Sequence, residues 1–189
     1  MSGARPYLLA AVATVFLSSA GMAGAHTMGG HYPMVGGAAM YPAKNIVENA
    51  VNSKDHTTRV AAVKAAGLVD TLESAGPFTV FAPTNEAFAK LPAGTVDTLV
   101  KPENKDTLTK ILTYHVVAGR LTGSDLRAKI KAGGGKAVLT TVEGEPLTVK
   151  MRGRHIILTD AKGGTSAVTI PNVIQSNGVI HVVDTVLMP

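Results

Sequence analysis

The chain of 189 residues has no cysteine, no tryptophan, and only four Phe and four Tyr. Without cysteine no disulfide can form and a lipid-modified N-terminal cysteine is excluded, so burial and hydrogen bonding must supply the stability. With so few aromatic side chains on which bases could stack, we do not expect a nucleic-acid-binding protein. The sequence also lacks Gly-x-Ser-x-Gly and His-Glu-x-x-His motifs and places no nucleophile beside a base. We therefore expect no enzyme and no cofactor.

Acidic residues are fewer than basic ones, which gives a formal charge of +5. The hydrophobic fraction of 46% is enough for the core of one domain. A mildly basic surface bears on solubility and on weak contact with polyanions, but it does not determine the fold.

The N-terminus has the pattern of a secretory signal peptide. Arg5 supplies a positive charge, residues 7–20 form an apolar run, and Ala23-Gly24-Ala25 has the small-residue spacing of a cleavage site. The apolar run is shorter than the roughly 20 residues needed to span a bilayer, although an uncleaved anchor is the alternative. We predict a signal peptide over residues 1–25, cleavage after Ala25, and a secreted or periplasmic protein without a stable membrane span. No apolar tail follows the last motif, so we expect no lipid-anchor signal.

Residues 26–42 are rich in Gly, Met and His and show no helical or strand period, which predicts a flexible lead-in. Cleavage after Ala25 would make His26 the first residue and leave its amine free. Thioether sulfurs suit Cu(I), so the segment is also a candidate copper site. Its candidate ligands are His26, Met28, His31, Met34 and Met40. The alternative is a linker that contains these residues without holding a metal.

Residues 78–88 read as one strand that leads directly into one helix. Alternation places Phe78, Val80 and Ala82 on one face and Thr79 and Phe81 on the other, so we expect a strand covered on both sides.

The helix start that follows this strand is also predicted. Pro83 ends the strand, Thr84 caps the helix, and Phe88 is placed to pack against Pro83.

Helical periodicity continues in the first two thirds of the chain, over residues 45–51, 57–66, 95–100, 104–113 and 124–131. Most of the short β-branched runs come after these helical segments. We predict strands at 114–117, 137–142, 147–151, 155–159, 167–170 and 179–183. Asn177-Gly178 is a strong hairpin signal. Helices first and strands afterwards predict an α+β fold in which the early strand at residue 78 inserts into the later sheet.

Three ordered motifs resemble the fasciclin domain family. Residues 79–88 resemble its first signature motif, Tyr114-His115 its central pair, and residues 177–184 its second signature motif. The matching residues are Thr79, Phe81, Pro83, Thr84, Asn85, Phe88, Tyr114, His115, Asn177, Gly178 and His181. The resemblance covers residues 43–189 and implies a single, secreted domain of the bacterial type. It implies a compact β-sandwich with helices packed along one side, helices in its N-terminal part and strands in its C-terminal part.

The resemblance also implies a function in binding or adhesion at a cell envelope or extracellular matrix, with a protein or polysaccharide partner. In animal members the Tyr-His pair is assigned to receptor recognition, but the apolar neighbours of Tyr114 and His115 favour a buried, structural role. We favour a structural role for His181 as well. A second, acidic recognition motif corresponds to Pro171-Asn172-Val173, where Asn172 replaces the carboxylate. An amide is a weaker ligand for a divalent cation, so we expect no cation-dependent receptor binding.

The basic residues Arg127, Lys129 and Lys131 have two interpretations: a solvated helix face or a contact with acidic polysaccharide. Gly133-Gly134-Gly135-Lys136 lacks the spacing of a phosphate loop and is read as a flexible connection. We therefore predict an exported binding or adhesion module. The alternative is a periplasmic protein that binds copper or a small ligand through its His- and Met-rich N-terminus. The sequence leaves the oligomeric state open.

Overall fold

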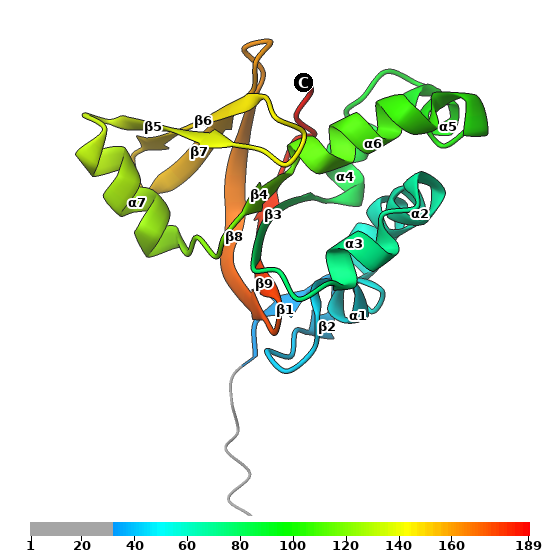
Figure 1. Ribbon diagram of the computed structural model, residues 1–189, viewed down its shortest axis with the longest axis horizontal. Coiled ribbons are helices and arrows are strands. Elements are labelled where there is room, and N and C mark those ends of the chain that lie inside the picture. The colour runs from blue at the N-terminus through cyan, green and yellow to red at the C-terminus, as the bar shows by residue number, and fades with distance from the viewer. Residues whose placement is uncertain (1–31) are drawn as a thin grey trace, which may run out of the picture. The chain divides into compact units, whose positions relative to one another are not determined.

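Strand β3 (Phe78–Pro83) lies inside the sheet, as the sequence predicts. The computed structural model, which describes residues 32–189, pairs β3 with β4 (Val116–Ala118) in antiparallel and with β9 (Gly178–Val183) in parallel orientation (Figure 1). Val80 and Ala82 pack into one hydrophobic cluster and Phe81 into another. Both faces of β3 are therefore covered.

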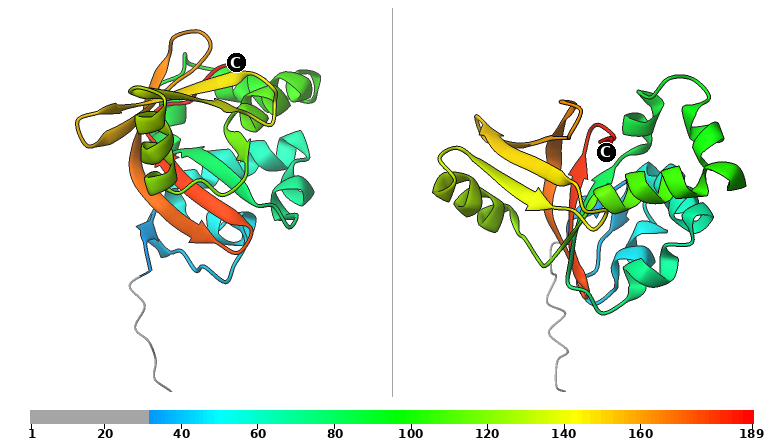
Figure 2. Two further views of the ribbon diagram at one scale, coloured as in Figure 1. Left: turned by 60° about the vertical axis from the view of Figure 1, so that its left-hand side comes forward. Right: turned by 45° about the horizontal axis from the view of Figure 1, so that its top comes forward.

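All the longer strands belong to one seven-stranded sheet of order β4-β3-β9-β8-β7-β6-β5. The remaining strands are β5 (Lys136–Thr140), β6 (Pro146–Arg152), β7 (His155–Thr159) and β8 (Thr165–Gln175). The long strand β8 is shared by two halves of the sheet, and its register with β9 shifts twice between Val168 and Val173. Figure 2 shows β5 to β7 folded at an angle to the β3–β9 half. The Val142 N–H donates to the Val116 carbonyl at 2.7 Å, so the two edge strands nearly meet.

The helices form two groups. Those along one side of the β3–β9 half are α1 (Ile46–Ala50), η1 (Lys54–His56), α2 (Thr57–Ala66), α3 (Val69–Glu73), α4 (Asn85–Ala89), α5 (Thr95–Leu99), η2 (Pro102–Asn104) and α6 (Lys105–Tyr114). Helix α7 (Gly123–Ala132) lies apart from them and buries Leu126 and Ile130 against the β5–β7 half. The predicted α+β fold is thus confirmed, and its two layers are halves of one continuous sheet.

The Thr84 cap and the Asn177-Gly178 turn follow the sequence patterns. The Thr84 hydroxyl accepts the Ala87 N–H at 3.2 Å at the start of α4. Ser176 and Asn177 join β8 to β9 as a tight hairpin, and Gly178 is the first residue of β9. A Cβ at Gly178 would lie 2.2 Å from the Phe78 carbonyl oxygen, so only glycine lets β9 approach β3 at this point.

Two expectations differ from the structure. The flexible lead-in predicted for residues 26–42 contains a short hairpin of β1 (Met34–Val35) and β2 (Ala38–Ala39), and Val35 and Met40 are buried in the core. Val35 and Met40 are buried against α1 and the sheet. A local sequence period does not reveal this burial, because the contacts are made with distant parts of the chain.

The strand predicted at residues 114–117 begins only at Val116, because Tyr114 is the last residue of α6 and His115 caps that helix. Within residues 32–189, no helix has the length and hydrophobicity needed to cross a membrane.

Phe88 tests the strand–helix unit. Its side chain is 6% exposed and packs with Ala87, Ile111 and Val186. Phe88→Ala should lower the free energy of unfolding by about 3–5 kcal/mol, because it removes buried area and leaves a cavity. Chemical denaturation measures the loss. As a control, the exposed Val51→Ala should change stability by less than about 0.5 kcal/mol. A Phe88→Ala loss as small as that of the control would contradict the packing of α4.

Candidate functional site

The Tyr114-His115 pair lies in the interior, where Tyr114 is 0% and His115 1% exposed. The Tyr114 hydroxyl donates to the Pro146 carbonyl at 2.9 Å and accepts the Ala161 N–H at 3.1 Å. Burial raises the pKa of Tyr114. The side chain thereby joins α6 to the loops that flank β6 and β7.

Both ring nitrogens of His115 are used. The Leu187 N–H donates to Nε2 at 3.0 Å, and Nδ1 lies 2.7 Å from the Ile111 carbonyl. Because Nε2 must accept, the proton is on Nδ1 and the ring is neutral. Burial, followed by the charge of Arg59, lowers the pKa of His115 to about 4. His115 thus holds the C-terminal segment against α6.

The two residues are therefore not available as the partner-binding surface that the family resemblance implies. The reason is physical: both side chains point into the packed interior and their polar atoms are already bonded within the chain.

Two asparagines of the signature motifs connect the helices to the sheet. The Asn177 side chain accepts the Ile46 N–H at 3.0 Å and donates to the Leu72 and Ser74 carbonyls at 2.7 and 2.9 Å. Asn177 therefore binds the start of α1 and the end of α3.

Asn85 binds the turn before α2. Its side chain accepts the Thr58 N–H at 3.0 Å and donates to the Lys54 carbonyl at 2.8 Å. The other motif positions are also mostly internal: Thr79, Phe81, Pro83 and Gly178 are buried.

Asn172 adopts a positive φ of 61° at the irregular part of β8. Its side-chain oxygen accepts the Gly123 N–H at 2.6 Å, which is one of the unpaired donors at the start of α7. Its own N–H donates to His181 Nδ1 at 3.3 Å, and His181 Nε2 lies 2.8 Å from the Leu121 carbonyl. Asn172 thus joins β8, β9 and the segment that leads into α7.

The buried His181 ring stacks on Phe81 with the ring centroids 5.7 Å apart. Burial and then the charge of Arg127 lower the pKa of His181. Asp184, close in sequence, accepts the Ala167 N–H at 2.9 Å and does not contact His181. This arrangement fits a structural role for His181.

The N-terminus of α7 is fixed by the chain itself. The Thr122 hydroxyl accepts the Asp125 N–H at 3.3 Å, and the Asp125 carboxylate accepts the Thr122 N–H at 2.8 Å. These bonds from Thr122 lower the pKa of Asp125. The helix is therefore rigidly capped where it meets Asn172.

The exposed residues Pro171, Asn172, Arg127, Lys129 and Lys131 form what we call the β8–α7 surface. A Cβ at Gly123 would lie 3.3 Å from the Asn172 oxygen and 3.5 Å from an Arg127 nitrogen, so these two side chains are neighbours. Val173, predicted with Pro171 and Asn172 as a contact residue, is 1% exposed and belongs to the core. The surface therefore carries Arg127 beside an exposed bulge, and Lys129 and Lys131 are exposed further along the same helix.

The candidate copper ligands are only partly described. His26, Met28 and His31 lie outside the described residues. Met34 is 55% exposed, whereas Met40 is 2% exposed and packs in the core, so Met40 is not available to a metal. Among residues 32–189, no three His, Cys, Asp or Glu side chains gather as a metal site.

Sequence reasoning missed two features. The Thr122-x-x-Asp125 capping box was readable as a local motif. Arg59 was not, because nothing in its sequence neighbourhood indicates that its side chain is buried.

We expect stability to fall as the pH is lowered from about 6.5 to 4. Over that range the unfolded chain binds a proton at His115 that the folded chain, with a pKa of about 4, does not bind. The loss for this one residue is about 3 kcal/mol, and His56, whose pKa is also lowered to about 4, adds a loss of the same sign. Below pH 4 these residues contribute no further change. Denaturant unfolding at several pH values measures the slope.

The matched variant for this experiment is His115→Gln, whose amide oxygen can still accept the Leu187 N–H but does not titrate. Its stability should depend less steeply on pH between 6.5 and 4 than that of the natural protein. Equal slopes for the two proteins would contradict the neutral, buried state of His115.

Asn172→Ala should destabilise the protein by about 2 kcal/mol, because it removes the acceptor for Gly123 and places alanine, which tolerates a positive φ less well than asparagine, at this position. Asn172→Gly removes only the acceptor and should therefore cost less. Thermal unfolding of both variants separates the two contributions. If Asn172→Gly were the more damaging change, the strained backbone would not be part of the explanation.

Comparison with known proteins identifies the family. A family model described as Fasciclin domain matches residues 54–189. The chain is 48% identical over 156 residues to Protein sll1483 of Synechocystis sp., covering 82% of this chain and 79% of that protein. It is 40% identical over 122 residues to Cell surface glycolipoprotein MPB83 of Mycobacterium bovis, covering 65% of this chain and 48% of that protein.

A solved structure of a FAS1 domain pair from the insect cell adhesion molecule fasciclin I superimposes with a TM-score of 0.69. It covers 77% of this chain and 51% of that chain at 19% identity, which shows a shared fold. The family model, the identity to sll1483 and the fold agree, and the chain belongs to the fasciclin domain family.

Proposed function

We propose that the protein is an exported, non-enzymatic binding module that acts in adhesion at the cell envelope or in the extracellular matrix. The fasciclin domain occurs in an insect cell adhesion molecule and in a mycobacterial cell surface glycolipoprotein, which supports a role outside the cytoplasm. Proteins with the same fold can bind different partners through different surfaces. The binding surface and the partner therefore depend on the residues of this chain.

The observation that carries the proposal is the charge of the β8–α7 surface. Arg127, Lys129 and Lys131 are exposed on a helix whose start is fixed by its own capping box and by Asn172. Cations on a rigid helix attract anionic partners, and the backbone that carries them loses less conformational entropy on binding than a mobile segment does. The partner that fits these cations is an acidic polysaccharide or an acidic protein.

A cation-bridged receptor contact fits the same surface poorly. The residue that would have to ligate the metal is Asn172, whose amide oxygen already accepts the Gly123 N–H at 2.6 Å. An amide also lacks the charge with which a carboxylate holds a divalent cation. We therefore propose a contact that depends on salt and not on divalent cations.

The test is retention on immobilised dextran sulfate, an acidic polysaccharide, with salt and chelator varied separately. The natural protein should be retained at low salt and released as salt rises, because charges are screened beyond about 8 Å at physiological ionic strength. Chelator should have no effect. The triple variant R127E/K129E/K131E should lose retention.

The matched control is K101E/K105E/K110E, which makes the same change of charge at exposed positions on and beside α6. It should keep most of the retention and its salt dependence. Equal losses in both triple variants would mean that net charge alone acts, and chelator-sensitive, salt-insensitive retention would restore the receptor-type contact. Either result contradicts the proposed surface.

A further inference from the structure

Arg59 is a buried cation in the helical group. Its side chain is 5% exposed, and one guanidinium nitrogen donates to the Phe81 carbonyl at 2.9 Å. Within residues 32–189 this is the one hydrogen bond that the structure gives the side chain, although a guanidinium has further N–H donors in a planar fork. Burial lowers the pKa of Arg59 to about 10, with no contribution from an acidic neighbour in the described chain.

The groups that face Arg59 do not balance its charge. Burial, followed by the nearby charge of Arg59, lowers the pKa values of His56 and His115 to about 4, so both rings are neutral at neutral pH. A buried charge without a partner is costly, and removing it in favour of an apolar residue is often neutral or stabilising. Arg59 therefore needs a reason beyond packing.

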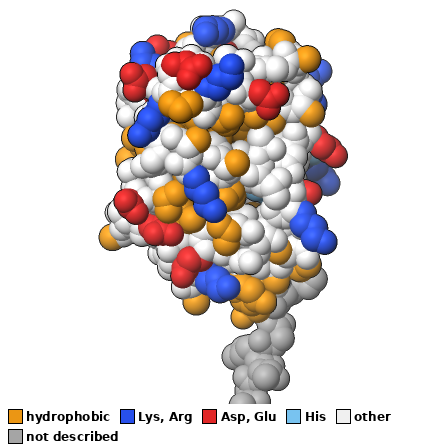
Figure 3. All heavy atoms as spheres, turned by 90° about the vertical axis from the view of Figure 1, so that its right-hand side faces the viewer, with side chains coloured by type: hydrophobic (Ala, Val, Ile, Leu, Met, Phe, Trp, Pro, Cys, Tyr) orange, Lys and Arg blue, Asp and Glu red, His pale blue; other side chains and the backbone are white. Residues whose placement is uncertain are grey.

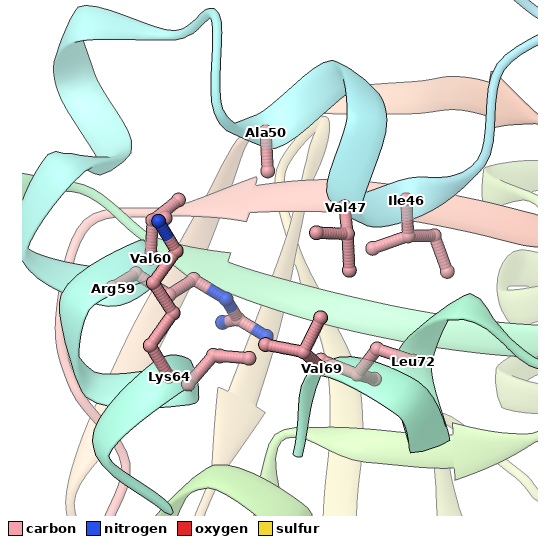
Figure 4. Close-up of a pocket in the computed structure, with 9 residues that line it drawn as sticks. Ile46, Val47, Ala50, Arg59, Val60, Lys64, Val69 and Leu72 are labelled. Carbon is pink, nitrogen blue, oxygen red and sulfur yellow. The ribbon is translucent and has the colours of Figure 1, made fainter. Parts of the chain in front are cut away.

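A cleft leads to Arg59 between α1, α2 and α3. Figure 4 shows the guanidinium extending from α2 toward the side chains of α1 and α3, with Lys64 on the same helix. The other lining residues are apolar: Ile46, Val47, Ala50, Val60, Val63, Val69 and Leu72. Lys64 is exposed, whereas Val47 and Val69 are half-buried, so the cleft has an apolar mouth with a second cation beside it. Figure 3 shows the helical side of the molecule, where hydrophobic side chains gather around basic ones.

A second cavity touches Arg59 from the sheet side. It shares Ile46, Ala50 and Arg59 with the cleft and is also lined by His56. His56 is 4% exposed, and its Nε2 has no hydrogen-bond partner among the described residues. The Ala82 carbonyl raises the pKa of His56, but its geometry does not make a hydrogen bond to Nε2. Arg59 and His56 thus present unused polar atoms to space whose other lining residues, apart from Ser53, are apolar.

The size of this space limits the occupant. The cleft and the cavity each have a volume of about 30 Å³. At about 10–15 Å³ for each water molecule, each holds about two waters, which is about the space that the two oxygens of one carboxylate occupy. A planar, anionic end group of that size matches the fork of a guanidinium. The rest of the occupant must be short and apolar and must lie at the mouth of the cleft, against Val47 and Val69.

We propose that the Arg59 cleft binds a short-chain monocarboxylate, with the carboxylate on the guanidinium and the short alkyl chain at the apolar mouth, against Val47 of α1 and Val69 of α3. Lys64 at the mouth attracts the anion on its way in. Phosphate and dicarboxylates fit less well, because they would bring additional charge against Val47, Val69 and Leu72. This site is separate from the β8–α7 surface and does not depend on the adhesion proposal.

The experiment is an NMR titration of the full chain with sodium acetate, propionate and butyrate at constant ionic strength. Saturable shifts should appear at the amides of Ala50, Val63 and Val69, and butyrate should bind more tightly than acetate. Butyramide, which has the same shape without the charge, and sodium phosphate, which has charge without the alkyl chain, are the comparison ligands. Both should bind about tenfold more weakly or not at all.

Two variants separate binding from folding. Arg59→Lys keeps a cation but loses the planar fork, and it should weaken butyrate binding about tenfold. Ala50→Leu leaves Arg59 in place and fills the mouth of the cleft, so it should abolish binding in a folded protein even where Arg59→Lys fails to fold. Ala61→Leu makes the same substitution at an exposed position of α2 and should bind as the natural chain does.

The absence of saturable shifts with butyrate would overturn the proposal and leave Arg59 as a donor to Phe81 beside buried water. Equal binding of butyramide or phosphate, or unchanged binding by Ala50→Leu, would also overturn it.

Discussion

The parallel pairing of β3 with β9 is the constraint on which the rest of the structure depends. Residues 78–83 and 178–183 pair one to one across the whole length of both strands. Because parallel neighbours cannot be joined by a tight turn, the chain between them must be long enough to return to the end of the sheet at which β3 begins. The helices α4 to α6, strand β4, helix α7 and the β5–β8 half of the sheet are this long connection. The two signature motifs of the family are therefore neighbours in space: they contain two paired strands and the residues that start and end them.

That central pair also explains why so many motif residues are polar and yet buried. Apolar contacts cover both faces of these strands, but such contacts are not directional. Hydrogen bonds from side chains fix the position of the strands relative to the neighbouring layers. Asn177 and Asn85 attach the helical layer, Thr79 donates to the Gly119 carbonyl at 2.6 Å, and His181 binds the Leu121 carbonyl. A buried polar group that lost its partner would cost about 1–3 kcal/mol, which makes these side chains specific for this arrangement.

These hydrogen bonds also show which motif residues of this chain have a structural role. The Tyr114-His115 pair and His181 are framework, because their polar atoms are used inside the chain. The residues that we propose for binding have no place in the signature motifs: the cations of α7 are exposed, and Arg59 lies below its cleft. Arg59 differs from the framework residues because its guanidinium is only partly used.

The sequence by itself determined the local elements. Alternation, Pro83 and the Thr84 cap predicted β3 and the start of α4, and Asn177-Gly178 predicted the last hairpin, because periods and caps depend on residues a few positions apart. Only the tertiary structure decided which side chains meet. Ile46 and Asn177 are 131 residues apart, His115 and Leu187 are 72 apart, and Gly123 and Asn172 are 49 apart. Such partners are set by how elements pack and not by local propensity. The burial of Arg59 and of Met40, and the place of the Tyr-His pair at a helix end, therefore had no local sign. The sequence likewise identified the basic residues of α7. Only the tertiary structure shows that one of them, Arg127, lies beside Asn172 of β8.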